Sequence, residues 1–240
     1  MALKIWQTDP ENKPEPAKSY DSDLDGAFSI GAQDKEGNPV ALDTFRVSLS
    51  DPNKADAIAQ LFGGSVVETD RTNEHYIDVT TARDKVLVIV EDPKALYADM
   101  KKWDNGKLTH HCDGEIFISH PINEKLIGSA CGCPELFVER KQHAKAGLGP
   151  KPAIELTFRL ADDPDLGVFK FKTSAWTLAK VLHEAEEALE RINGEALVEL
   201  SLTLVEFVIK KGKDKGTQVS YYAPGIKVLK SYQSAIAEGE

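Results

Sequence analysis

Residues 154–171 read IELTFRLADDPDLGVFKF, two short apolar segments around a turn. In the first segment, 154–158, every second residue is apolar, which is typical of a strand with one buried face. Residues 162–167, DDPDLG, combine the residue types that favour turns. The segment 168–171 is again rich in apolar residues. The stretch therefore predicts a β-hairpin near the centre of the fold.

The chain on the C-terminal side continues this regular pattern. Ser174 can cap a helix that runs to about Ile192, because its apolar residues repeat in steps of three and four. Residues 193–194, Asn-Gly, end this helix, and a long strand follows at 197–209. The apolar face of that strand shifts near Glu206, which predicts a bulge or a strand shared between two cores.

The N-terminal half also contains segments with the patterns of strands and helices. An alternating strand is expected at 45–49, and Asp51 with Pro52 begins a helix that ends at Gly63-Gly64. Two further strands are expected within 76–90. Asp92-Pro93 then predicts a short helix that carries Leu96, Met100 and Trp103.

These segments predict an α+β fold with two small α/β-type units of mixed or antiparallel sheet, each with packed helices. A loop-rich segment that contains His and Cys joins the two units. The expected organisation is an extended N-terminal arm at 1–40, an N-terminal unit at 41–104, a His/Cys segment with a short helix at 105–150, a C-terminal unit at 151–232 and a flexible tail at 233–240. The sequence contains no internal repeat strong enough to indicate duplication.

All three cysteines of the protein lie in the joining segment. In an extended chain, residues i and i+2 point the same way, so His110 and Cys112 can reach one ion and Cys131 and Cys133 can do the same. Four such ligands are the number that a closed tetrahedral zinc site needs. His111 is expected to point away, although it could exchange roles with His110. The sequence therefore predicts a structural zinc ion.

Two alternatives remain for this cluster: ordinary cysteines in a polar loop, or redox-active thiols. Pro134 is expected to open a helix that stops at Gly147, which places Cys133 just before the helix N-terminus, where the thiolate form is favoured. A catalytic zinc site would keep one position open for water, whereas four candidate ligands favour a closed site.

The composition indicates which partners to expect. The net charge of −10 is unfavourable for a protein whose main affinity is for phosphates, and it suits a soluble protein that binds other proteins or basic surfaces. The first residues lack the apolar core of a signal peptide, and no apolar run approaches about 18 residues. An odd number of cysteines without an export signal argues against a framework of disulfides. The expected location is therefore a reducing cytoplasm.

Other motifs are weaker. The basic run at 140–151 and the lysines at 210–215 can be DNA contacts or solvated surface, and the negative net charge favours the second interpretation. Glu139-x-Lys141 has the form seen in some metal-dependent nucleases but falls in an expected helix. The sequence contains no phosphate-binding loop, nucleophile elbow or zinc-protease helix. No enzymatic activity is therefore expected.

Four segments resemble the large recombination directionality factors of actinophages that use large serine integrases. They are GLGPKPAIELTFRLADDPDLGVFKFKTSAWTLA at 147–179, LTLVEFVIKKGKDKGTQVSYYAPGIKV at 202–228, IWQTDPENKPEP at 5–16 and FRVSLSDPNKADAIAQLFGG at 45–64. The resemblance covers about residues 3–230, and FRLADDPDLGVFKF is its most specific part.

The resemblance implies a switch without catalysis of its own. Such a factor binds a serine integrase and redirects it from integration to excision of the prophage by recombination of attL with attR, inside the bacterial host cell. Contact with DNA is then indirect, through the integrase. The alternative function is a phage protein of DNA metabolism, either a single-strand DNA binder or a nuclease-like enzyme, and a continuous basic cleft would favour that alternative.

Overall fold

One twisted sheet runs through the part of the chain that the structure describes, which is residues 24–33, 39–69, 75–210, 212 and 215–238 of a computed structural model. The sheet has 12 described strands. They are β1 Gly26–Gln33, β2 Pro39–Leu49, β3 Ser65–Glu68, β4 Ile77–Thr80, β5 Lys85–Val90, β6 Leu96–Asp104, β7 Lys107–Cys112, β8 Phe117–Ser119, β9 Lys151–Leu160, β10 Val168–Thr173, β11 Ala196–Val208 and β12 Gln218–Ser231. The described α-helices are α1 Pro52–Phe62, α2 Phe137–Lys145, α3 Trp176–Ala179, α4 Leu182–Ile192 and α5 Tyr232–Glu238.

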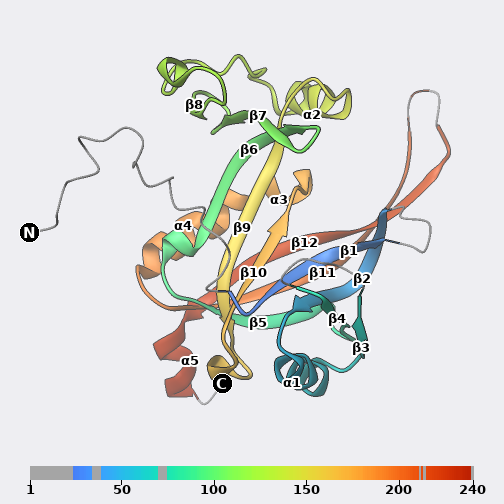
Figure 1. The fold of residues 1–240 in the computed structure, drawn as a ribbon, viewed down its shortest axis with the longest axis vertical. Helices are drawn as coiled ribbons and strands as arrows, with labels where there is room; N and C mark the ends of the chain where they lie inside the picture. The colour runs from blue at the N-terminus through green and yellow to red at the C-terminus, as the bar shows by residue number, and fades with distance from the viewer. Residues whose placement is uncertain (1–23, 34–38, 70–74, 211, 213–214, 239–240) are drawn as a thin grey trace, which may run out of the picture.

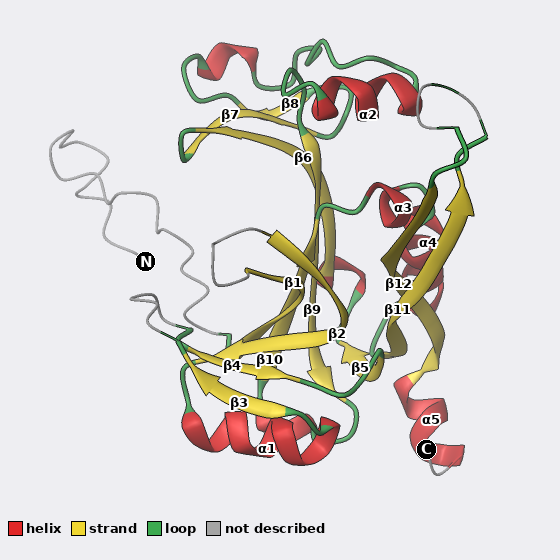
Figure 2. Cartoon of the chain, turned by 90° about the vertical axis from the view of Figure 1, so that its right-hand side faces the viewer, coloured by secondary structure: helices red, strands yellow, loops and turns green. Residues whose placement is uncertain are grey.

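The main path of the sheet has the order β12-β11-β5-β9-β10-β1-β2-β4-β3, and β6, β7 and β8 branch from β9 (Figure 1). Among the described strands, β1 and β10 form the one parallel pair, and the other pairs are antiparallel. Helix α1 covers the end of the sheet near β3 and β4, whereas α3 and α4 lie beside β11 and β12 (Figure 2).

The α+β class with a mainly antiparallel sheet is confirmed, but the description as two separate units is not. Strand β5 from the first predicted unit lies between β11 and β9 of the second. Strand β1, from the predicted arm, pairs with β10. These pairings satisfy the backbone hydrogen-bonding groups along strand edges that would otherwise be unpaired. The rest of the predicted arm, apart from residues 24–33 and the start of β2, lies outside the described residues.

The hairpin predicted at 154–171 is present as β9 and β10, with Leu156 opposite Phe171 and Phe158 opposite Phe169. Its aromatic rings form the centre of the core. The Phe28 ring lies 5.3 Å from Phe158 and 5.7 Å from Phe169, with edge-to-face geometry that favours aromatic contacts. These side chains are at most 1% exposed. The hairpin and β1 therefore share one aromatic core.

The turn of this hairpin holds the start of β1. An oxygen of Asp25 accepts a hydrogen bond of 2.8 Å from the Val168 amide, and the same carboxylate pairs with Lys54 of α1. Gly167 has φ of 131°, and a Cβ there would lie 2.0 Å from the Asp25 carboxylate. The glycine of DDPDLG is thus required by both the backbone conformation and the close approach of Asp25.

Two predicted helices differ from the structure. Residues 96–104 form strand β6 after a single 3-10 turn at Pro93–Ala95. The spacing of Leu96 and Met100 was ambiguous, because residues four apart share a face in both a helix and a strand. The helix predicted at 174–192 is broken at Lys180-Val181 into α3 and α4. Its predicted end is confirmed, because Asn193 adopts the left-handed conformation at the C-cap of α4.

The alternatives predicted near Glu206 were a bulge or a strand shared between two cores, and the structure shows no register shift there. The register of β11 with β12 shifts between Leu197 and Val198. Beyond Ser201, β11 has no further register with β5 and continues with β12 as a two-stranded ribbon, visible at the upper right of Figure 1. Residues such as Leu204 and Phe207 are exposed there. The change of apolar face therefore marks the point where the strand leaves the core.

Among the described residues, no helix has the length and apolar character needed to cross a membrane.

Candidate metal centre

Strands β6, β7 and β8 form a branch of the sheet at one end of the molecule, where helix α2 also lies (Figure 2). Strand β7 alternates its side chains, so His110 and Cys112 face one side and His111 faces the other. Cys131 and Cys133 arrive on the loop between β8 and α2. The structure therefore brings together all four residues predicted as metal ligands.

The ligand atoms of His110, Cys112, Cys131 and Cys133 all lie within 4.8 Å of one another. His110 Nε2 is 3.2 Å from Cys112 Sγ and 3.5 Å from Cys133 Sγ, and the two sulfur atoms are 3.8 Å apart. Around a tetrahedral zinc ion, bonds of about 2.3 Å to sulfur and about 2.0 Å to nitrogen place neighbouring ligands roughly 3.5–3.8 Å apart. These residues could hold a metal ion without a large rearrangement.

Burial sets the protonation of the metal-free site. It raises the pKa of the Cys112 thiol and of the Cys133 thiol, since a thiolate is costly in an apolar surrounding. Burial also lowers the pKa of His110, which keeps the imidazole neutral and its nitrogen able to bind a cation. A divalent cation would supply the charge that makes thiolates stable here.

Backbone contacts hold the cysteine loop in place. The Cys131 amide donates a hydrogen bond of 2.8 Å to the Glu115 carbonyl. Gly132 has φ of 74°, a left-handed conformation that turns the chain between the two cysteines. Arg140 of α2 donates to the Pro134 carbonyl. The loop therefore has contacts with the β7–β8 turn and with α2 that do not depend on a metal.

The expected effect of the helix on Cys133 is wrong. Helix α2 begins at Phe137, with Leu136 as its N-cap, so Cys133 is too far from the first turn to gain from the helix dipole. Desolvation dominates instead and raises the pKa of the thiol. The helix ends as predicted, with Gly147 in a left-handed conformation shortly after Lys145.

His111, on the opposite face of β7, forms a network that the sequence did not reveal. Its Nε2 is 2.6 Å from an Asp99 carboxylate oxygen, and its Nδ1 is 2.7 Å from the Ser119 hydroxyl. The Asp99 side chain is fully buried and also pairs with Lys101 at 2.9 Å. Because these residues come from β6, β7 and β8, the network ties together the three strands that carry the metal-ligand cluster.

Neither Glu139-x-Lys141 nor the basic run at 140–151 forms a second metal site in the described part of the chain. Glu139 and Lys141 are exposed on α2, and among the described residues only the His/Cys cluster gathers three or more His, Cys, Asp or Glu ligand atoms around one point. Of the basic run, Arg140 is used in the cysteine loop, whereas Lys145 and Lys151 line a separate pocket.

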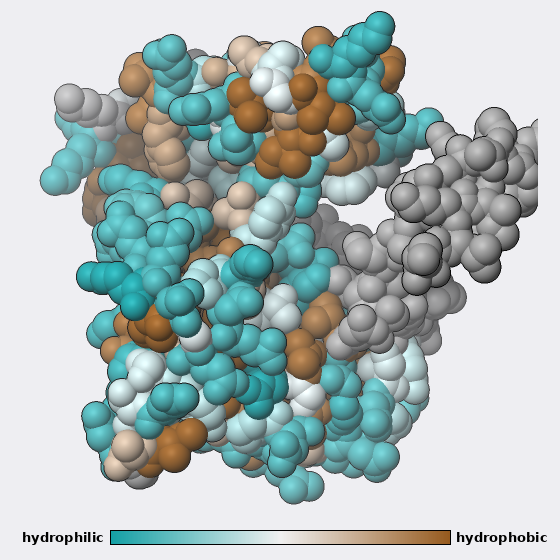
Figure 3. All heavy atoms as spheres, turned by 90° about the vertical axis from the view of Figure 1, so that its left-hand side faces the viewer, coloured by the Kyte–Doolittle hydropathy of each residue, from teal (hydrophilic) through white to brown (hydrophobic). Residues whose placement is uncertain are grey.

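Exposed apolar residues are frequent around the cluster. Five large ones lie between β7 and Cys131: Ile116, Ile118, Ile122, Leu126 and Ile127. Ile122 is 90% exposed. Figure 3 shows brown, apolar surface at this end of the molecule. A surface of this kind often contacts another protein.

The chain matches a known protein family over most of its length. Residues 25–229 match the sequence profile of the family described as Gp3-like: Recombination directionality factor-like. The match covers most of the chain and includes both the His/Cys cluster and the β9–β10 hairpin. No solved structure matches the chain.

Proposed function

Because the chain belongs to the Gp3-like, recombination directionality factor-like family, we propose that it binds a phage serine integrase and switches it from integration to excision. The observation that carries this proposal is the family match over residues 25–229. The protein acts without catalysis of its own, and it contacts attachment-site DNA specifically only through the integrase.

Charge supports a protein partner. The net charge of −10 opposes tight binding to bare DNA, whose phosphates require Lys and Arg. An integrase is expected to be basic because it binds DNA, and an acidic factor is steered toward such a partner. The exposed apolar residues beside the His/Cys cluster supply contact area of the kind that stabilises protein interfaces.

The switch requires differential binding. A factor that binds two integrase arrangements equally well shifts neither of them. The factor must therefore bind the arrangement that joins attL to attR more tightly, and each 1.4 kcal/mol of preference changes the ratio about tenfold. In this proposal the factor repositions a mobile part of the integrase within the DNA-bound assembly.

We also propose that the His110, Cys112, Cys131 and Cys133 cluster binds a structural zinc ion. Three thiols and one imidazole form a donor set that suits zinc, and with all four bound a tetrahedral shell would have no open position for substrate. The ion would link β7 to the loop that precedes α2. Its role is to fix that surface rather than to carry out chemistry.

The first prediction concerns recombination in vitro with the cognate integrase. Added protein is expected to convert attL × attR from a reaction with little product into an efficient one, and to inhibit attP × attB. The measurement is the yield of recombinant DNA with and without the protein. Heat-denatured protein is the control. If neither yield changes, the proposed function is wrong.

The second prediction concerns how the protein reaches DNA. In a gel shift at physiological salt, attachment-site DNA with this protein alone should show no sequence-specific shift. DNA already bound by integrase should migrate more slowly when the protein is added. A specific shift of attL or attR by the protein alone would contradict loading through the integrase and would favour direct DNA recognition.

A further inference from the structure

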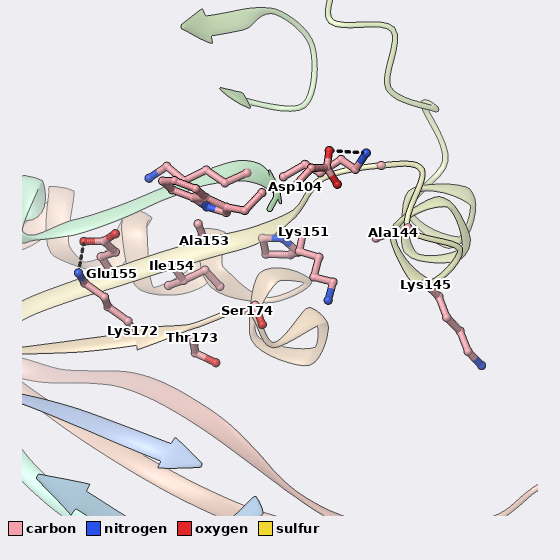
Figure 4. Close-up of a pocket in the computed structure, with 16 residues that line it drawn as sticks. Asp104, Ala144, Lys145, Lys151, Ala153, Ile154, Glu155, Lys172, Thr173 and Ser174 are labelled. Carbon is pink, nitrogen blue, oxygen red and sulfur yellow. Dashed lines mark ion pairs between the residues drawn. The ribbon is translucent and has the colours of Figure 1, made fainter. Parts of the chain in front are cut away.

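A basic groove lies between the branching strand β6, the main strands β9 and β10, and the C-terminal end of α2 (Figure 4). Its volume is about 710 Å³, within the range of known ligand sites. Its residues are distinct from the four of the metal centre. Five lysines line it: Lys101, Lys102, Lys145, Lys151 and Lys172.

The charge of the groove is opposite to that of the protein. Its lining contains five lysines and two carboxylates, Asp104 and Glu155, whereas the chain as a whole carries −10. Lys102 pairs with Asp104 at 2.9 Å, and Lys172 lies 3.9 Å from Glu155. A local positive surface on an acidic protein concentrates anions at that surface.

Two of the lysines stand apart from these pairs. None of the ion pairs found among the described residues involves Lys145 or Lys151, and both side chains are exposed. In Figure 4 they extend on the side of the pocket away from the pair of Lys172 and Glu155. Lys151 is also directly opposite Lys101 in the register of β9 with β6, but Lys101 is paired with the buried Asp99 at 2.9 Å. The groove lysines outside these ion pairs are therefore Lys145 and Lys151.

An aromatic side chain completes the groove. Trp103, next to Lys102 at the end of β6, lines the pocket and is 60% exposed. An exposed indole beside lysines is the arrangement on which unpaired bases stack while the backbone phosphates contact the cations. The lining contains no arginine, so it lacks the planar fork that recognises carboxylates in pairs.

We propose that this groove binds an unpaired DNA strand, with its phosphates on Lys145 and Lys151 and a base stacked on Trp103. The binding is independent of base sequence and strongly dependent on salt. It is compatible with the absence of a specific shift on attachment-site DNA, because it does not depend on sequence and weakens at physiological salt. The site goes beyond the proposed switch and does not require an integrase.

The test is the fluorescence anisotropy of labelled oligothymidine titrated with the full-length protein at low salt. Saturable binding is expected. If Lys145 and Lys151 neutralise two phosphates, a tenfold rise in salt should weaken it about 25-fold. Polyglutamate of similar length serves as the competing acidic peptide, and a duplex of the same length as the competing DNA form. Both should displace the strand at least tenfold less effectively than unlabelled oligothymidine.

The variants separate this site from general charge effects. Lys145→Gln with Lys151→Gln should weaken binding at least tenfold, and Trp103→Ala should weaken it on the order of tenfold through the lost stacking. The matched control is Lys94→Gln with Lys227→Gln, which removes the same charge from exposed positions outside the groove and should change binding less than twofold. Circular dichroism checks that each variant is folded.

Three results would overturn the proposal. They are no binding of oligothymidine at low salt, equal losses in the groove and control variants, or equally effective displacement by polyglutamate or by duplex. The recombination assay with integrase tests the proposed switch and not the groove. Either proposal can therefore be wrong while the other is right.

Discussion

Zinc is expected to copurify with this protein at about one ion per chain, and Cys112→Ser is expected to abolish that stoichiometry. Structural zinc contributes on the order of 10 kcal/mol in small peptides, where the four ligands supply much of the folding energy. Changes to residues that only orient metal ligands already lower affinity about 10–100-fold, so loss of a ligand should exceed that range. Elemental analysis of protein purified without a His-tag provides the measurement.

Removal of the metal should affect one part of the molecule. Because the aromatic core of the main sheet does not include the cluster, chelation should increase hydrogen exchange in residues 105–135 and leave β9 and β10 protected. Burial raises the pKa of both Cys112 and Cys133 in the metal-free state, so zinc uptake near neutral pH should release thiol protons, and the apparent affinity should rise with pH.

His183→Ala is the matched control for the measurement of zinc content, because His183 is exposed on α4 outside the cluster. This variant should retain a full complement of zinc. Wild-type protein without zinc, or zinc that persists in Cys112→Ser, would contradict the site. Either result would return the cluster to the two alternatives, ordinary cysteines or redox-active thiols.

Phe158→Ala is expected to lower the free energy of unfolding by about 3–5 kcal/mol, the usual cost of emptying a large aromatic site in a core. Phe158 is 1% exposed and contacts both Phe28 and Phe169, so its removal leaves a cavity where β1, β9 and β10 meet. Domains are stable by only about 5–15 kcal/mol, so a large share of stability would be lost. Urea denaturation at a fixed zinc concentration measures the change.

A Phe→Ala substitution on the two-stranded ribbon of β11 and β12 provides the control. Phe207 is 47% exposed and its ring contacts that of Tyr221, with centroids 6.4 Å apart. Phe207→Ala should cost less than about 1.5 kcal/mol, since about half of this residue stays exposed in the folded protein and its loss leaves no enclosed cavity. Equal losses for the two variants would show that the aromatic core is not where the structure places it.

The sequence was most informative where structure depends on neighbouring residues. The β9–β10 hairpin follows from alternation and a turn with Asp, Pro and Gly, and the metal-ligand cluster follows from the types and spacing of four residues. The residues 96–104 were misassigned because an even spacing of apolar residues fits both a helix and a strand. In that case the pairing of β6 with β7 and β9 decides the structure.

Features that combine residues from distant segments could not be predicted from the sequence. The position of β5 between β11 and β9 depends on strand pairing that no local pattern encodes. Asp99 and Ser119 carry no motif, and only the branching of β6, β7 and β8 brings them to His111. The groove lysines were visible in part as the basic run at 140–151, but Lys101 and Lys172 join it through the fold.

The parallel pairing of β1 with β10 has a consequence for synthesis on the ribosome. The Val168 amide that binds Asp25 lies 143 residues further along the chain, and Val198 of β11 lies 110 residues after Val88, its partner in β5. At about 5–20 residues per second, β1 and β5 leave the ribosome many seconds before their partners. Contacts of such long sequence separation fold slowly. The nascent chain should therefore remain sensitive to proteases until translation has passed β11, and chains terminated early should not accumulate in native form.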